Sequence, residues 1–140
     1  MYTVEESLNE ISLSVIDNIP SDNWENVSLN VCALNKMIAI KSFYEEKGNF
    51  LSFDPEGNGN DITMKIKKLR EDMYQSAPNK GAWFSAMFTI SNNGKFQTFF
   101  DYDEKPEFKY EPSTDKFIAD LKTFPREEKL IPAWLKEKIG

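Results

Sequence analysis

Hydrophobic residues recur along this chain with two different periods, and the change of period separates predicted helices from predicted strands. Near the N-terminus the apolar positions have helical spacing. They are Leu8, Ile11, Val15 and Ile19. Thr3 followed three residues later by Glu6 has the pattern of a capping box, so a helix is expected to begin there and to end before Pro20.

From residue 27 onward the apolar residues alternate with polar ones, which is typical of strands with one buried face. The alternation over residues 27–33, a turn at Asn35 and the run over residues 37–44 predict two antiparallel strands. A turn over residues 45–49 leads to a third, short strand at residues 50–53.

A second helix is predicted after the loop at residues 54–60, with Asn60 or Asp61 as its cap. Its apolar stripe would be Ile62, Ile66, Leu69 and Met73. Its basic residues are expected largely to face outward as a solvated surface. These are Lys65, Lys67, Lys68 and Arg70.

The region of residues 82–102 predicts a hairpin closed at Ser91–Asn92–Asn93–Gly94. In its first strand one face would carry Ala82, Phe84, Ala86, Phe88 and Ile90, and the other would carry Trp83, Ser85, Met87 and Thr89. In its second strand Phe96, Thr98, Phe100 and Tyr102 share one face, with Phe99 opposite.

In the C-terminal region a third helix is predicted, with Ser113 as its cap and a break at Pro125. A short amphipathic segment around Trp134 follows. The order α-βββ-α-ββ-α predicts an α+β fold, in which an antiparallel sheet of about five strands carries helices packed on it. At 140 residues the chain is expected to form a single domain, residues 1–140.

The net charge of −6 is unevenly distributed. Residues 1–61 carry 3 basic and 11 acidic side chains, whereas residues 62–80 carry 5 basic and 2 acidic ones. An acidic surface repels phosphate backbones and attracts basic proteins, so we expect no direct nucleic-acid binding and favour a basic protein partner. The same acidity also serves solubility, which leaves a purely solvating role open.

The N-terminal residues are acidic where a signal peptide would be basic, and no apolar stretch approaches the length that spans a bilayer. We therefore expect a cytoplasmic protein without membrane contact. The single cysteine, Cys32, cannot form an internal disulfide and is interpreted as a packing residue.

The absence of histidine removes the nucleophile systems built on a Ser/His or Cys/His pair, and no metal-ligand spacing or phosphate-binding motif is present. No cofactor and no catalytic residue are expected. Two carboxylate groups keep an alternative open, an enzyme that acts on a sugar or nucleotide. They are Asp101, Asp103 and Glu104, and Glu45 with Glu46.

Three stretches resemble the YezG-like immunity family, the antitoxins of bacterial polymorphic toxins. They are NIPSDNWENVSL, GAWFSAMFTISNNGKFQTFFDYD and FKYEPSTDKFIADLKTFPREEKLIPAWLKE. The similarity extends over most of the chain and is weakest in residues 34–60. Its strongest points are two tryptophans and four short segments. They are Trp24 and Trp83, Gly94–Phe96 with the following Phe100–Asp103, Phe124–Arg126, and Ile131–Leu135.

The resemblance implies a small protein that binds the toxic domain of a cognate effector, expected to be a basic nuclease, and neutralises it. The expected partner-binding residues are Asp101, Tyr102, Asp103, Glu104, Glu107, Tyr110, Glu45 and Glu46. Packing and a local turn bond are the alternative roles for Tyr102 and Asp101, and core packing is favoured for Trp83 and Trp134. A general interaction adaptor and a homodimer stay open.

Overall fold

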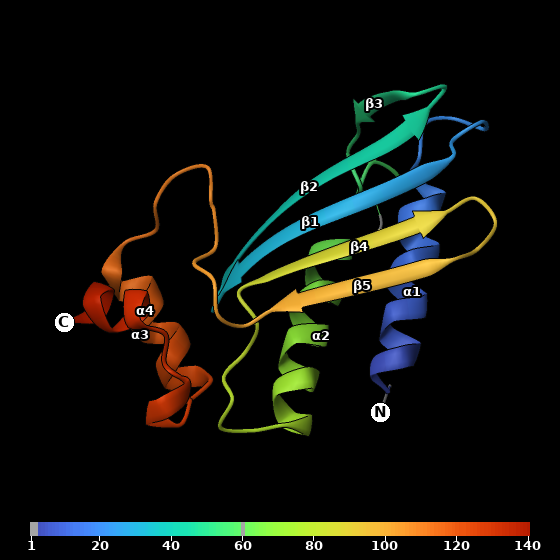
Figure 1. The fold of residues 1–140 in the computed structure, drawn as a ribbon. Helices are drawn as coiled ribbons and strands as arrows, with labels where there is room; N and C mark the ends of the chain where they lie inside the picture. Colours follow the sequence, from blue (N-terminus) through green and yellow to red (C-terminus); the bar gives the residue numbers. More distant parts are fainter. Residues whose placement is uncertain (1–2, 60) are drawn as a thin grey trace.

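The computed structural model of the chain describes residues 3–59 and 61–140, which form an α+β fold (Figure 1). The predicted order of elements is confirmed, with the C-terminal helical region divided into two helices and a short 3-10 turn. The elements are α1 (Val4–Asp17), β1 (Asn26–Leu34), β2 (Met37–Glu46), β3 (Asn49–Ser52), α2 (Ile62–Ser76), β4 (Ser85–Ser91), β5 (Phe96–Asp101), α3 (Thr114–Thr123), the 3-10 turn (Glu128–Leu130) and α4 (Ala133–Ile139).

The five strands form one antiparallel sheet in the order β3-β2-β1-β4-β5. Strand β1 lies at its centre, paired with β2 on one side and with β4 on the other. The β1–β4 pairing joins segments that are separated in sequence by α2, so the edges of the sheet are the four-residue β3 and the strand β5.

Helices α1 and α2 lie together on one face of the sheet (Figure 1). The apolar residues predicted from the two periods meet there in the main core, because helical spacing and strand alternation each place one apolar face against the other layer. Its buried members are Ile11, Val15, Val27, Leu29, Val31, Ala33, Tyr44, Ile62, Ile66, Leu69, Trp83, Ala86, Phe88 and Ile90.

A second, smaller core joins α3 and α4 to one end of the sheet (Figure 1). It contains Leu34, Phe84, Phe117 and Leu135. Trp134 packs edge-on against Phe84 and Phe117, and its indole nitrogen donates a hydrogen bond of 2.6 Å to the carbonyl oxygen of Asp103. The packing roles expected for Trp83 and Trp134 are therefore confirmed.

The helix starts follow the predicted capping chemistry at two of three positions. The hydroxyl oxygen of Thr3 accepts a hydrogen bond from the backbone nitrogen of Glu6, and the Asp61 carboxylate accepts one from Met64. Ser113 stands at the N-cap position of α3, but its side chain makes no capping hydrogen bond. Asn60, the other residue considered for the cap of α2, lies outside the described residues.

The predicted alternation is wrong at the start of β4. Trp83 belongs to the main core, and Phe84 belongs to the second core rather than to the face that carries Ala86. The backbone nitrogen of Phe84 donates to the carbonyl oxygen of Asp101, which is also the register partner of Ser85. Two residues thus oppose one, as in a β-bulge, and the extra residue turns the two aromatic side chains towards different cores.

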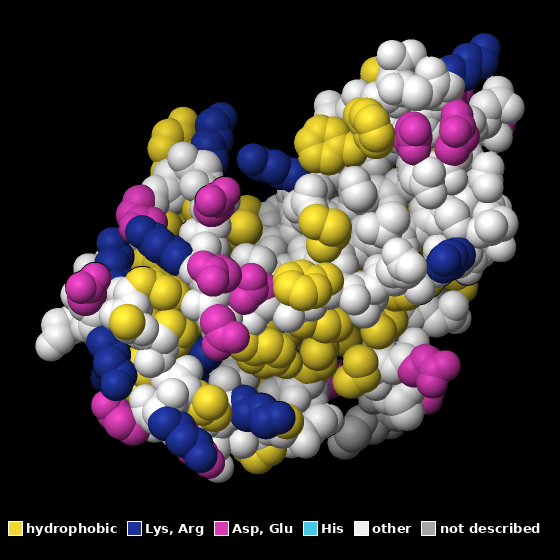
Figure 2. Space-filling model, in the orientation of Figure 1, with side chains coloured by type: hydrophobic (Ala, Val, Ile, Leu, Met, Phe, Trp, Pro, Cys, Tyr) yellow, Lys and Arg dark blue, Asp and Glu magenta, His cyan; other side chains and the backbone are white. Residues whose placement is uncertain are grey.

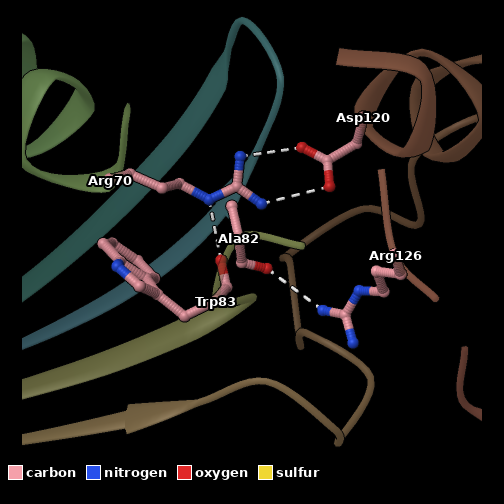
Figure 3. Close-up of polar contacts among 5 residues, drawn as sticks. All are labelled: Arg70, Ala82, Trp83, Asp120 and Arg126. Atoms are coloured by element: carbon pink, nitrogen blue, oxygen red, sulfur yellow. Dashed lines mark hydrogen bonds and ion pairs between the residues drawn. The ribbon is translucent and has the colours of Figure 1, made fainter. Parts of the chain in front are cut away.

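The prediction that Arg70 faces outward is also wrong. Arg70 is 2% exposed, and its guanidinium forms two hydrogen bonds with the Asp120 carboxylate, of 2.7 and 3.1 Å (Figure 3). A third bond, of 2.7 Å, runs from Nε of Arg70 to the carbonyl oxygen of Trp83. The contact connects α2, α3 and the residues before β4, which is why a basic side chain is retained inside.

A candidate protein-binding face

The sheet face opposite α1 and α2 is not covered by either helix, and we call it the open face (Figure 1). Directly opposed residues of antiparallel strands share a face, so the register assigns side chains to it. Those of the central strand are Asn26, Ser28, Asn30 and Cys32. On the other four strands they include Lys41, Phe43, Glu45, Phe50, Met87, Thr89, Gln97, Phe99 and Asp101.

Three large apolar side chains of the open face are exposed. Phe50 is 71% exposed, Phe99 63% and Met87 48%. Met87 and Phe99 are cross-strand partners on β4 and β5, whereas Phe50 lies on β3 at the other side of the sheet. Figure 2 shows hydrophobic side chains scattered over this face, separated by polar surface. Aromatic and methionine side chains exposed in this way are typical of interface centres.

Small polar side chains fill the middle of the open face between these apolar residues. Ser28 and Asn30 on β1 stand beside Thr89 and Met87 on β4. A depression of about 420 Å³ lies over β4 and β5, lined by Met87, Thr89, Gln97, Thr98 and Phe99. A partner side chain can therefore enter this part of the surface without displacing the core.

The acidic residues after β5 are organised by a local turn. One oxygen of the Asp101 carboxylate accepts hydrogen bonds from the backbone nitrogens of Asp103 and Glu104, at 2.9 and 3.0 Å. This is the local turn bond considered for Asp101, and it leaves Asp103 and Glu104 exposed. The turn therefore holds two carboxylates in solvent at the end of β5.

Tyr102 does not share the open face with Asp101. Its ring is half-buried against the main core, which confirms the packing role considered for it. It lines a cavity of about 240 Å³ together with Lys80, Asp103 and Arg126. Burial raises the pKa of the Tyr102 phenol above its ordinary value of 10.0, and the positive charges of Arg126 and Arg70 offset part of that rise.

Arg126 also lines this cavity, and backbone oxygens hold its side chain. Its guanidinium donates hydrogen bonds of 3.1 Å to the carbonyl oxygens of Leu130 and Ala82, the latter drawn in Figure 3. It also lies 4.5 Å from the ring centre of Phe84. Burial lowers the pKa of Arg126, and the nearby carboxylates of Asp120 and Asp103 oppose that effect. This arginine therefore connects the C-terminal segment to the residues that precede β4.

Glu107 and Tyr110 lie in the loop that follows β5. Both are exposed, Tyr110 by 76%, and the ammonium of Lys109 lies 5.6 Å from the Tyr110 ring centre. The carbonyl oxygen of Glu107 lies 3.6 Å from the sulfur of Cys32, which is half-buried on the open-face side of β1. The loop thus reaches the open face, and Cys32 packs beneath it rather than in the main core.

Glu45 and Glu46 lie at the end of β2, away from the acidic turn. The Glu45 carboxylate accepts a hydrogen bond of 2.9 Å from the Asn26 side chain, and that of Glu46 accepts one of 2.6 Å from Ser21. From the strand register, Glu45 and Asp101 are separated by about 20 Å along the strands and about 14 Å across them. The two predicted acidic groups are therefore separate, and together they flank the open face at opposite corners.

The described residues hold no group of three or more histidine, cysteine, aspartate or glutamate side chains arranged to bind a metal ion. Every helix in residues 3–59 and 61–140 is too short or too polar to cross a bilayer.

The exposed apolar residues of the open face were not among the predicted site residues. Met87 and Phe99 stand on the second face of their strands in the alternation, where polar residues are expected in a sheet covered on one side. That departure from alternation is the signal that could have identified them. Phe50 lies at a strand end and gives no comparable signal.

Comparison with protein-family models and with curated proteins gives no match for this chain.

Proposed function

We propose that this chain is a cytoplasmic immunity protein, which binds the toxic domain of a cognate polymorphic toxin and neutralises it. The observation that carries the proposal is the open face, where exposed apolar side chains lie between two separated acidic groups. Exposed aromatic and methionine side chains with charged residues around them are typical of protein-binding surfaces.

The acidic rim favours a basic partner. Glu45 at one corner and the exposed carboxylates of Asp103, Glu104 and Glu107 near the other would meet lysines and arginines of the toxin. Nucleases bind phosphate backbones through basic surfaces, so a toxin of this class offers the complementary charge. Complementary charge increases the rate of association, and the apolar residues contribute most to the lifetime of the complex.

The proposal requires a toxin gene beside the gene of this chain, and it is tested with the toxic domain which that neighbour would encode. Co-expression should restore growth of cells that produce the domain, and calorimetry with the purified proteins should show a stable complex. If that domain neither binds the chain nor loses its toxicity, the proposed function is wrong.

A matched pair of variants tests the exposed apolar side chains of the open face. Phe99→Ser on the open face should weaken binding by at least about tenfold, because a buried aromatic anchor is lost. Leu13→Ser is the control, since Leu13 is 61% exposed but belongs to α1 on the opposite face. Equal affinities for the two variants would place the interface elsewhere.

A second pair tests the acidic rim without disturbing the Asp101 turn. Glu104→Lys should slow association several-fold at low salt and reduce the dependence of the rate on salt. Glu71→Lys on α2 changes the net charge equally on the opposite side of the sheet. If both reversals slow association alike, only the net charge of the chain matters and not the position of the acids.

A further inference from the structure

The edge of the sheet formed by β5 is unprotected. Strand β5 ends the strand order, and no other described segment pairs with its outer side. Its sequence, FQTFFD, contains neither proline nor lysine, the residues that commonly prevent edge strands from pairing with other chains. The opposite edge is the four-residue β3.

The register identifies the backbone groups that are free to pair. The backbone nitrogen of Ser91 donates to the carbonyl oxygen of Lys95 at 2.9 Å, so the ladder between β4 and β5 begins at that pair. Hydrogen-bonded pairs alternate in an antiparallel ladder. The residues that bond to β4 are therefore Gln97, Phe99 and Asp101, and the N–H and C=O groups of Phe96, Thr98 and Phe100 point away from the sheet.

Apolar surface lies beside these groups. Figure 2 shows a band of hydrophobic side chains along the β5 edge, where α1 and α2 project beyond the strand in Figure 1. The half-buried apolar residues on this helix side of the sheet include Val4, Leu8, Met73, Phe96, Phe100 and Tyr102. A groove of about 650 Å³ separates the beginning of α1 from Gly94 and Phe96.

The wall of the groove is acidic. Glu5 and Glu6 in the first turn of α1 line it and are exposed, and α1 contains no lysine or arginine. Asp101 lies at the other end of β5. A segment bound along this edge would therefore meet the negative charge of Glu5 and Glu6 beside the start of β5.

We propose that the β5 edge binds an extended, basic segment of a partner protein as a sixth strand of the sheet. Backbone hydrogen bonds to Phe96, Thr98 and Phe100 would hold it, its apolar side chains would cover the band beneath the edge, and its lysines or arginines would meet Glu5 and Glu6. Assigning this segment to the toxin rests on the proposed function, whereas the chemistry of the edge does not.

A second copy of this chain does not fit the same site. Antiparallel pairing of two β5 strands about a two-fold axis would bring the projecting ends of α1 and α2 from both copies into the same space behind the joined sheet (Figure 1). It would also add the acidic first turn of a second α1. A strand or hairpin without a helical layer on that side is the occupant that fits.

Two probes test the edge: the neighbouring toxic domain, and a short capped peptide of alternating lysine and valine. Either should slow amide hydrogen exchange, read residue by residue by NMR, at Phe96, Thr98 and Phe100. An alternating glutamate and valine peptide should give no protection. If neither basic probe slows exchange at these amides, the edge site is wrong.

The two probes also separate this inference from the proposed function. Binding of the toxic domain, with no protection of the β5 amides by either probe, would leave the proposed function standing and refute the edge site. Protection of the β5 amides by the peptide, without any binding of the toxic domain, would support the edge site and refute the proposed function.

Proline substitution provides the matched variants. Thr98→Pro removes an outward N–H while leaving the ladder to β4 intact, and it should weaken the binding of a protecting probe by about tenfold or more. Ser52→Pro on the β3 edge is the control and should bind normally. Equal binding by the two variants would overturn the assignment even if Thr98→Pro proves less stable.

Discussion

Replacing Asp120 by alanine should destabilise the fold more than removing any exposed acid. The Asp120 side chain is 6% exposed and that of its partner Arg70 is 3% exposed. Alanine would leave the two Nη atoms of Arg70 without their carboxylate, in a place that water does not reach. It would also remove a negative charge that acts on Arg126, whose guanidinium is close enough to Arg70 to be affected by its positive charge.

The expected cost is about 3–5 kcal/mol, the range for removing one partner of a buried ion pair. Domains are stable by about 5–15 kcal/mol in total, so Asp120→Ala should lose a large part of the stability of this chain. Asp120→Asn keeps the shape and one acceptor oxygen, and we expect it to lose less. Chemical unfolding in urea at neutral pH, followed by circular dichroism, measures both variants.

The double variant Arg70→Met with Asp120→Leu, compared with its two single variants Arg70→Met and Asp120→Leu, isolates the interaction itself. Apolar replacement of both members of a buried pair is often close to neutral, so the double variant should be more stable than Asp120→Ala. The exposed pair Lys68–Asp72, 3.2 Å apart, is the control, and Asp72→Ala should cost only about 0.5 kcal/mol. A cost for Asp120→Ala no greater than this control, or strict additivity at residues 70 and 120, would refute the reasoning.

Three further predictions concern the backbone and pH. Gly81 has φ +76, and a Cβ there would overlap the Arg126 side chain, whereas Gly94 has φ +88 and open space around it. Gly81→Ala should therefore lower the free energy of unfolding by about 1–3 kcal/mol more than Gly94→Ala does. Equal thermal unfolding midpoints for the two variants would contradict this. The pKa of Tyr102 is raised in the folded state, so stability should decline as pH rises above 10.0 towards that folded pKa. Tyr102→Phe should flatten this decline in alkaline urea titrations. An unchanged decline would show that burial of the Tyr102 phenol does not cause it. Hydrogen bonds from two lysines lower the pKa of Glu111 below 4.5, so its contribution to stability is present above pH 4.5 and is lost as pH falls through the folded pKa. Glu111→Gln should therefore reduce the dependence of the urea midpoint on acid pH. An identical acid profile would show that these hydrogen bonds do not persist in solution.

Local patterns determined most of the fold. Alternation over residues 27–33 and helical spacing over residues 62–73 depend on which side of one element is apolar, and the main core confirms both. The cap at Thr3 is equally local, since donor and acceptor lie three residues apart. The acidity of the surface is a property of composition alone.

The order of the strands was decided by contacts between distant residues. The pairing of β1 with β4 leaves β5 as an edge, and no short stretch of sequence encodes that neighbour. The same pairing places Met87 and Phe99 on an uncovered face. The separation of Glu45 from the acidic turn follows from the strand order as well, because two intervening strands lie between them.

The sequence alone determined which segments are helices and strands, since hydrophobic period and capping act over a few residues. It also determined that the chain is acidic and contains no histidine. Only the tertiary structure decided that Arg70 is buried, because its carboxylate partner Asp120 is 50 residues away in the chain. It likewise decided which apolar side chains stay exposed, since burial depends on how the layers meet and not on the residue type.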